Sequence, residues 1–174
     1  MATKQALTFD RLQAELESYG NAVREMYQQR LISSDRVASH DLIDTVTALV
    51  RGGDGGTYEV VLSLQGYWKW VEYGTKPHRP PYSKILEWVK IKPVIPRPKN
   101  GKLPKPESLA WAITKKIEKE GTEGSGDLTK SVADLYPVYY PKILQALTDD
   151  LEDGIRRFLL QTFGSLEADR IAGA

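Results

Sequence analysis

The chain has 174 residues, 41% hydrophobic and 27% charged, with a net charge of +1; this fits one globular domain, or one with an excursion, and excludes a disordered chain. The absence of cysteine excludes disulfide frameworks, thiolate metal sites and thiol nucleophiles, and it fits folding in a reducing cytoplasm. No run of about 18 apolar residues is present and the N-terminal residues lack the apolar core of an export signal, so we expect neither a membrane span nor export.

A long amphipathic helix is predicted near the N-terminus. Thr8 is a candidate N-cap, and Asp10 is favourable in the first turn. Apolar residues then recur at steps of three and four as far as Leu31. Gly20 weakens this helix by about 1 kcal/mol relative to alanine without ending it. We expect the helix to lie on a sheet; a coiled-coil seam is the alternative.

A β-hairpin is predicted after the first helix. Residues 41–50 are rich in β-branched side chains and favour a strand, with a helix as the alternative for the first half. Residues 52–56 are a glycine turn, and residues 57–64 alternate with a period of two. We expect one face of this hairpin to be buried under the first helix.

An aromatic segment follows, and we expect two helical turns over Tyr67–Tyr73. Tyr67, Trp70 and Val71 would share one face of these turns, and Trp68 would share another with Glu72. Gly74 is then predicted to close the helix in the left-handed conformation, because the prolines that follow cannot continue it. We interpret the Glu72 carboxylate as ordering the turn, through backbone N–H groups or an arginine, with a functional carboxylate as the alternative.

The middle of the chain predicts a short helix and a proline-stiffened arm. Ser83 is a candidate cap for a helix that runs to Lys92. Prolines from Pro93 to Pro98 require extended backbone, and residues 99–102 are a turn. The side chains expected to face inward from the helix are Ile85, Leu86, Trp88 and Val89.

Two further helices complete the prediction. The first opens at Pro106 or Glu107 and stops at Gly121, and residues 121–127 are predicted to be a flexible link. A short segment then leads through Pro137 and Pro141 to a last helix that ends near Gly164, followed by a frayed tail. The last helix has one apolar face, made by Tyr140, Ile143, Leu144, Leu147, Leu151, Ile155, Phe158 and Leu159.

One motif resembles a known family. The residues are Trp70, Val71, Glu72, Tyr73, Gly74 and Thr75, directly after a strand and followed by Pro77, Pro80 and Pro81. This pattern resembles the head–tail joining and tail-completion proteins of long-tailed bacteriophages. The stretches ILEWVKIKPVIPRP and LAWAITKKIEKEGTEG look like the neck proteins of crAss-like phages that infect Bacteroides.

The resemblance covers residues 8–163 and implies a fold. That fold is α+β, a small antiparallel sheet packed by a long N-terminal and a long C-terminal helix, with a proline-rich basic arm. Residues 1–174 would be a single head–tail joining domain, in which the arm and a helix, residues 88–126, are an insertion relative to shorter members of the family.

The resemblance also implies a structural role and not an enzyme. The chain would form a neck ring that joins the capsid portal to the tail and keeps the DNA path continuous, without a cofactor or metal. A twelvefold ring is favoured and a sixfold ring is the alternative. Its partners would be the portal or an adjacent neck protein and a tail protein. It would be made in the host cytoplasm and reside in the virion.

The candidate ring interface lies in the aromatic segment, because aromatic and arginine side chains are favoured at interfaces and a ring needs complementary flanks. Stacking of these tryptophans on nucleic-acid bases is the lesser alternative. The candidate interface residues are Trp68, Trp70, Glu72, Tyr73, Gly74, Thr75 and Arg79.

The charge is unevenly distributed along the chain. Residues 76–119 hold 12 basic and 3 acidic side chains, whereas residues 1–75 hold 7 and 10 and residues 120–174 hold 5 and 10. A basic middle between acidic ends can face an identical neighbour, which we favour, or nucleic acid. The runner-up function is therefore a cytoplasmic nucleic-acid-binding protein.

The basic arm has three interpretations. It docks on an adjacent ring or the portal, it lines a channel with weak, non-specific contact to passing DNA, or it is solvated. Its residues are Lys90, Lys92, Arg97, Lys99, Lys102 and Lys105.

No catalytic or metal motif is apparent. The sequence contains no P-loop, dinucleotide fingerprint, GxSxG or HExxH. His40 and His78 have no ligand partner at a suitable spacing. The acidic residues of 149–153 point around a helix instead of converging, so we interpret them as a solvated face.

Overall fold

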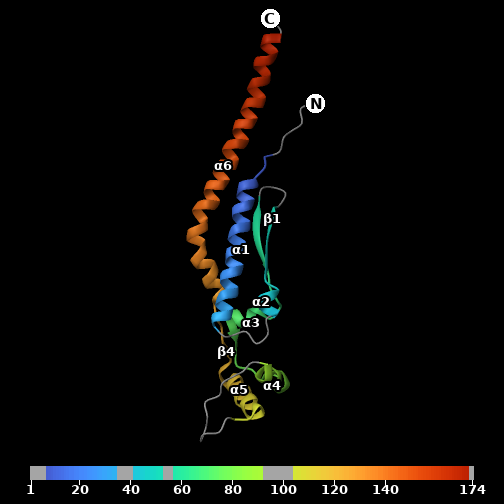
Figure 1. Cartoon of the computed structure of the whole chain (residues 1–174), viewed down its shortest axis with the longest axis vertical. Coiled ribbons are helices and arrows are strands. Elements are labelled where there is room, and N and C mark those ends of the chain that lie inside the picture. The colour runs from blue at the N-terminus through green and yellow to red at the C-terminus, as the bar shows by residue number, and fades with distance from the viewer. Residues whose placement is uncertain (1–6, 35–40, 53–56, 92–103, 173–174) are drawn as a thin grey trace. The chain divides into compact units, whose positions relative to one another are not determined.

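The structure is a computed structural model that describes residues 7–34, 41–52, 57–91 and 104–172 (Figure 1). The chain combines helices with a small antiparallel sheet, which confirms the predicted α+β class. The predicted turn at 53–56 and the extended prolines of 93–98 lie outside the described residues. The elements are α1 (Asp10–Ser33), α2 (Asp41–Asp44), β1 (Thr47–Gly52), β2 (Tyr58–Ser63), α3 (Trp68–Tyr73), β3 (Gly74–Thr75), α4 (Tyr82–Ile91), α5 (Pro106–Glu120), β4 (Thr122–Glu123) and α6 (Asp127–Ala172).

The chain divides into two compact units, and α1 and α6 each contribute to both. The first unit comprises residues 1–23, 48–62 and 133–174. The second comprises residues 24–47 and 63–132. The β1–β2 hairpin belongs mostly to the first unit, and the β3–β4 pair belongs to the second.

In the first unit, the N-terminal half of α1 packs between the hairpin and α6. A Cβ placed on Gly20 would lie 2.9 Å from Cγ1 of Val60, so the helix approaches β2 where a side chain is missing. The rings of Tyr19 and Tyr139 lie 5.5 Å apart and join α1 to α6. The predicted hairpin and its burial against the first helix are confirmed. Gly20, which costs helix propensity, is explained by this close approach.

The second unit is built around a small core. Tyr27 and Leu31 of α1 are fully buried against residues of α2 and against Val46. The side-chain amide of Gln28 donates a 2.6 Å hydrogen bond to the carbonyl of Ile43 and fastens α2 to α1. Partly buried side chains that pack on this core are Leu64, Tyr67, Trp68, Val71 and Leu128.

The segment 41–50 is half helix and half strand, the alternative that its sequence had left open. Leu42 and Ile43 are adjacent and both buried. A strand would send them to opposite faces, whereas one turn of helix allows both to reach the core. The strand therefore begins only at Thr47.

In the second unit, α4 and α5 pack against each other. The Tyr82 hydroxyl donates to the carbonyl of Glu107 at 3.2 Å, and Val89 and Ala110 are buried. The predicted bounds of α5 are confirmed, since it begins at Pro106 and Gly121 follows it. Ser83 is not the cap of α4: the helix starts at Tyr82, and the carbonyl of Pro81 accepts its first hydrogen bonds.

The last helix is longer than its sequence predicts. α6 runs unbroken from Asp127 to Ala172 and contains both Pro137 and Pro141. Each proline removes one backbone hydrogen bond, but neither ends the helix. Gly164 does not end it either, since one glycine costs only about 1 kcal/mol.

Candidate functional site

The N-terminus of α6 is capped by Glu72. The N-cap position is Gly126, whose carbonyl accepts the first helical hydrogen bond, from Lys130, and which has no side chain to serve as a cap. The carboxylate of Glu72 supplies the missing acceptor. Its Oε2 accepts the N–H of Leu128 at 2.9 Å, and its Oε1 accepts the N–H of Thr129 at 2.9 Å and the hydroxyl of Thr129 at 2.6 Å.

These donors are the N–H groups that a capping side chain normally satisfies at the second and third helical positions. The carboxylate is 2% exposed, and its negative charge lies at the positive end of the α6 dipole. Glu72 does accept backbone N–H groups, as predicted, but they belong to the first turn of α6, 56 and 57 residues further along the chain, and not to the local turn at Gly74 and Thr75.

The residues around this cap are buried, and two of them are acidic. Ser125 Oγ accepts the N–H of Asp127 at 3.2 Å, and the Asp127 side chain is itself buried. Burial, reinforced by the charges of Glu72 and Asp127, raises the pKa of Tyr27 to about 12. The Tyr27 hydroxyl has no hydrogen-bond partner among the described residues. Tyr27 therefore stays neutral near neutral pH.

The N-terminus of α1 is also capped by a carboxylate that is distant in the sequence. Its N-cap is Phe9, whose carbonyl accepts the N–H of Gln13, so Thr8 is not the cap that the sequence predicts. The buried Asp150 of α6 accepts the N–H of Leu12 at 2.9 Å instead. Arg11 lies 2.7 Å from Asp153, which raises the pKa of Arg11 mainly through that hydrogen bond. The acidic run of 149–153 is therefore only partly a solvated face.

Glycines let two distant segments meet beside the Glu72 cap. Gly74 and Thr75 pair antiparallel with Glu123 and Thr122. A Cβ on Gly74 would lie 2.1 Å from the carbonyl oxygen of Thr122, and one on Gly121 would lie 2.1 Å from that of Thr75. Neither position tolerates a side chain.

Two sequence interpretations are corrected here. Gly74 closes α3 as predicted, since its N–H donates to the carbonyl of Trp70, and its φ of 73 is positive; its ψ of −167 is extended, however, so it is not in the left-handed helical conformation and leads directly into β3. Residues 121–127 are not a flexible link, because Thr122 and Glu123 form β4 and Ser125 is buried. The N–H groups of Ser125 and Gly126 donate to the carbonyls of Val71 and Glu72. Long-range pairing has ordered a segment whose composition favours disorder.

The candidate interface residues separate into two groups. Glu72 and Gly74 are occupied by contacts within the chain, Thr75 lies in β3, and Trp68 packs on the core. Trp70 and Tyr73 are 64% and 70% exposed, and Arg79 is exposed in the proline turn. Trp70 thus does not share a buried face with Tyr67 and Val71.

The basic arm is only partly described. Lys90 is exposed at the end of α4, and Lys105 is exposed directly before α5. Lys92, Arg97, Lys99 and Lys102 lie outside the described residues. On α5, Lys115 lies 2.7 Å from Glu118 and lowers the pKa of that carboxyl, chiefly by a hydrogen bond.

The apolar face of α6 is the surface whose exposure the sequence does not predict. The face that α6 buries carries Ala146, Asp150 and Gly154. Successive residues of an α-helix are rotated by about 100° around its axis. The predicted apolar face therefore points away from the buried face by roughly a third of a turn. Ile143 and Leu147, at the border, are half-buried. The rest of that face is between 38% and 65% exposed, namely Tyr140, Leu144, Leu151, Ile155, Phe158 and Leu159.

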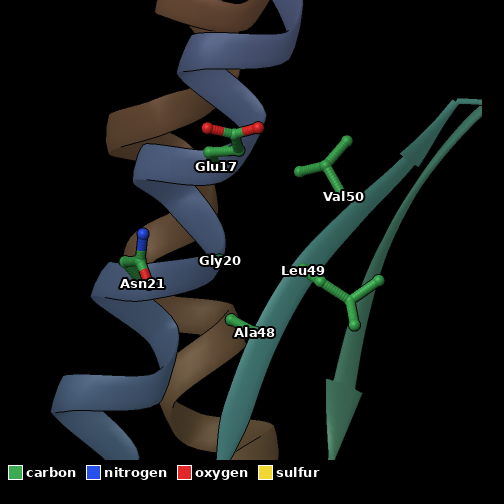
Figure 2. A pocket seen from close by; sticks show the side chains of 6 residues that line it. All are labelled: Glu17, Gly20, Asn21, Ala48, Leu49 and Val50. Atoms are coloured by element: carbon green, nitrogen blue, oxygen red, sulfur yellow. The ribbon is translucent and has the colours of Figure 1, made fainter.

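No constellation for chemistry appears in the described ranges. They contain no group of three metal-ligating side chains, and none of their helices has the length and apolar character that a membrane crossing needs. His78 contacts the carbonyl of Lys76 through Nδ1. A shallow groove between α1 and β1 is lined by Glu17, Asn21 and four small or apolar residues (Figure 2). Its carboxylate, Glu17, is exposed and accepts a hydrogen bond from the side-chain amide of Gln13.

No family model, curated protein or solved structure matches this chain. Function is therefore inferred from the chain's own residues. The relevant features are the Glu72 cap, the exposed aromatic side chains of α3 and the apolar face of α6.

Proposed function

We propose that this chain is a structural subunit of a bacteriophage neck ring, which joins the capsid portal to the tail and keeps the DNA path continuous. The observation that carries the proposal is the exposed apolar face of α6. A monomer seldom leaves a contiguous apolar surface of more than a few hundred Å² in water, and such surfaces mark interaction sites.

The size of this face suits a stable assembly. Six large apolar side chains along one side of a helix are each more than a third exposed. A standard interface buries roughly 800 Å² per partner, and apolar burial contributes about 25 cal/mol per Å² before the costs of association. An enzyme or a monomeric binding module has no need of this surface, whereas a subunit enclosed by neighbours does.

The motif resembling phage head–tail joining proteins has a mechanical role in this proposal. Glu72 fixes the first turn of α6, and Gly74 and Gly121 admit the β3–β4 pair beside it. The motif thereby holds the start of the helix that carries the assembly surface. The resemblance rests on residues 70–81, and the exposed apolar face of α6 adds support from other residues.

The exposed aromatic residues supply further contact area. Trp70 and Tyr73 are amphipathic, and Arg79 follows them in a turn stiffened by prolines, which lose little entropy on docking. In this proposal they contact a neighbouring subunit, and the lysines of the basic arm dock on the portal or line the DNA channel. A twelvefold ring follows the portal.

The test is whether the chain occupies virions as a ring. Virions from a lysate that contains the chain are purified and analysed by mass spectrometry and cryo-microscopy. A closed ring of this chain between portal and tail is the expected result. The control for the apolar face is a pair of variants, Ile155→Asp on that face and Arg51→Asp at an exposed position in β1. Only Ile155→Asp should abolish incorporation.

The opposite result has a definite meaning. A chain absent from virions that retards DNA at low salt, and loses this binding steeply as salt rises, would be a nucleic-acid-binding protein. Charge reversal at Lys90 and Lys105 should then abolish the retardation. That outcome would overturn the neck proposal and make the basic arm the functional site.

A further inference from the structure

The described side chains of α6 beyond Gly154 lie at the surface. Every described side chain from Ile155 to Gly164 is exposed, including those of Phe158, Leu160 and Phe163. Apolar residues lie on more than one side of this segment, and a helix of that kind is normally buried. An isolated helix of this length is marginal in water, so contacts with another surface would stabilise it.

A shallow apolar depression marks one side of this segment. It is lined by Glu152, Ile155, Arg156, Leu159 and Leu160, which follow one another at steps of three and one along α6. Three of these side chains are aliphatic and two are charged. This composition suits a large aromatic anchor with a cationic neighbour, since such anchors carry most of the energy of an interface.

The same chain presents such an anchor on α5. Trp111 is 60% exposed, although indole is among the side chains most favoured for burial at interfaces. Lys115 and Lys119 follow at steps of four and are exposed on the same side of the helix. We call Trp111, Lys115 and Lys119 the α5 outer face.

The two segments differ in charge. Residues 149–157 of α6 carry four acidic and two basic side chains; Asp150 and Asp153 lie 3.7 and 2.7 Å from Arg11, whereas the exposed Glu152 lines the depression together with Arg156. Residues 105–119, which include the α5 outer face, carry four basic and two acidic side chains. Complementary charge steers two surfaces together and selects against the wrong partner.

We propose that the α6 depression receives the α5 outer face of a second copy of this chain, with the indole of Trp111 seated between Ile155 and Leu159. Lys115 and Lys119 then lie near Glu152. One contact covers the exposed apolar side chains of both surfaces, whereas an α6–α6 pair would leave Trp111 in water. Because the two surfaces differ, the contact is heterologous, and repetition about an axis closes a ring. The inference deepens the proposed neck ring and rests on it.

The absence of native cysteine makes the test direct, because only introduced thiols react. Full-length Lys115→Cys and Glu152→Cys are made with different affinity tags, mixed across a concentration series and treated with a short bismaleimide; both positions are exposed, and Trp111, Ile155 and Leu159 stay intact. The expected product is a heterodimer with both tags. The matched control replaces Lys115→Cys by Glu59→Cys, an exposed position in β2, and should give little product. The Trp111→Ala variant should weaken self-association by about thirtyfold in light scattering, the loss typical of a hot spot.

The remaining outcomes overturn the inference in distinguishable ways. Cross-linking of Glu152→Cys to itself identifies an α6–α6 pair, and no cross-linking at any concentration identifies a different protein as the partner of α6. In either case the virion experiment decides the proposed function independently. A ring in virions without the 115–152 cross-link retains the neck role and discards this contact. The cross-link without a virion ring retains the contact and discards the neck.

Discussion

Replacement of Glu72 tests how the two distant halves of the second unit are joined. In Glu72→Gln the side-chain amide nitrogen faces either the N–H of Leu128 or that of Thr129, so one capping hydrogen bond becomes a donor–donor contact. Hydrogen bonds to a charged acceptor contribute about 1.5–3 kcal/mol, and the helix dipole adds about 0.3–1 kcal/mol. We expect Glu72→Gln to lower the free energy of unfolding by about 2 kcal/mol, and Glu72→Ala by about 3 kcal/mol because both N–H groups are orphaned.

The assay is urea unfolding followed by tryptophan fluorescence, which reports on Trp68 in the core, and by far-UV circular dichroism. The matched control is Glu107→Gln, because Glu107 also lies in the first turn of a helix but is exposed. Its loss should stay below about 1 kcal/mol. A double-mutant cycle with Thr129→Val isolates the 2.6 Å hydrogen bond to Glu72. A Glu72→Gln variant within about 0.5 kcal/mol of the parent, with no coupling to Thr129, would refute the capping argument.

Three further predictions address other features of the fold. Gly74→Ala should lower the free energy of unfolding by about 3 kcal/mol, because its Cβ would lie 2.1 Å from the carbonyl oxygen of Thr122. Gly66→Ala is the control and should be tolerated, since a Cβ there has nothing within 4 Å. Equal thermal midpoints for the two variants would contradict the close approach at Gly74. Burial raises the pKa of Tyr27 to about 12, so the unfolded chain ionises first and the parent should lose about 1.4 kcal/mol per pH unit between pH of about 10 and about 12. Tyr27→Phe should remove that alkaline loss and gain about 1 kcal/mol at neutral pH by deleting an unpaired buried hydroxyl; an unchanged alkaline unfolding curve would count against it. Asp150→Asn should cost about 1–2 kcal/mol, since its carboxylate caps α1 at the N–H of Leu12, and a neutral effect on chemical denaturation would remove that role.

Local sequence signals predicted the elements whose order depends on near neighbours. The three- and four-residue spacing of α1, the alternation in β2 and the proline at the start of α5 all act over a few residues. The glycine after α5 stops it for an equally local reason. The α+β class follows from the sum of these elements.

The candidate site was only half predictable. The Glu72 carboxylate was expected to order a turn, but its partners are the N–H groups of residues more than fifty positions away. Nothing in the composition of residues 121–127 distinguishes a flexible linker from a glycine-rich strand pressed against Gly74. A signal was nevertheless present, because α6 begins after a glycine that cannot cap it. The lack of a local cap requires an acceptor from elsewhere.

The amino-acid sequence by itself determined the amphipathic periodicity of the helices, the hairpin, and the fact that α6 has one apolar face. Tertiary structure decided which face of α6 is buried. Docking against α1 brought Asp150 to the N–H of Leu12 and Gly154 next to Leu7, so capping and close packing selected a face of small and polar residues. The apolar face therefore points outward, because the periodicity of a sequence shows which residues share a helix face but not which face will pack against neighbouring elements.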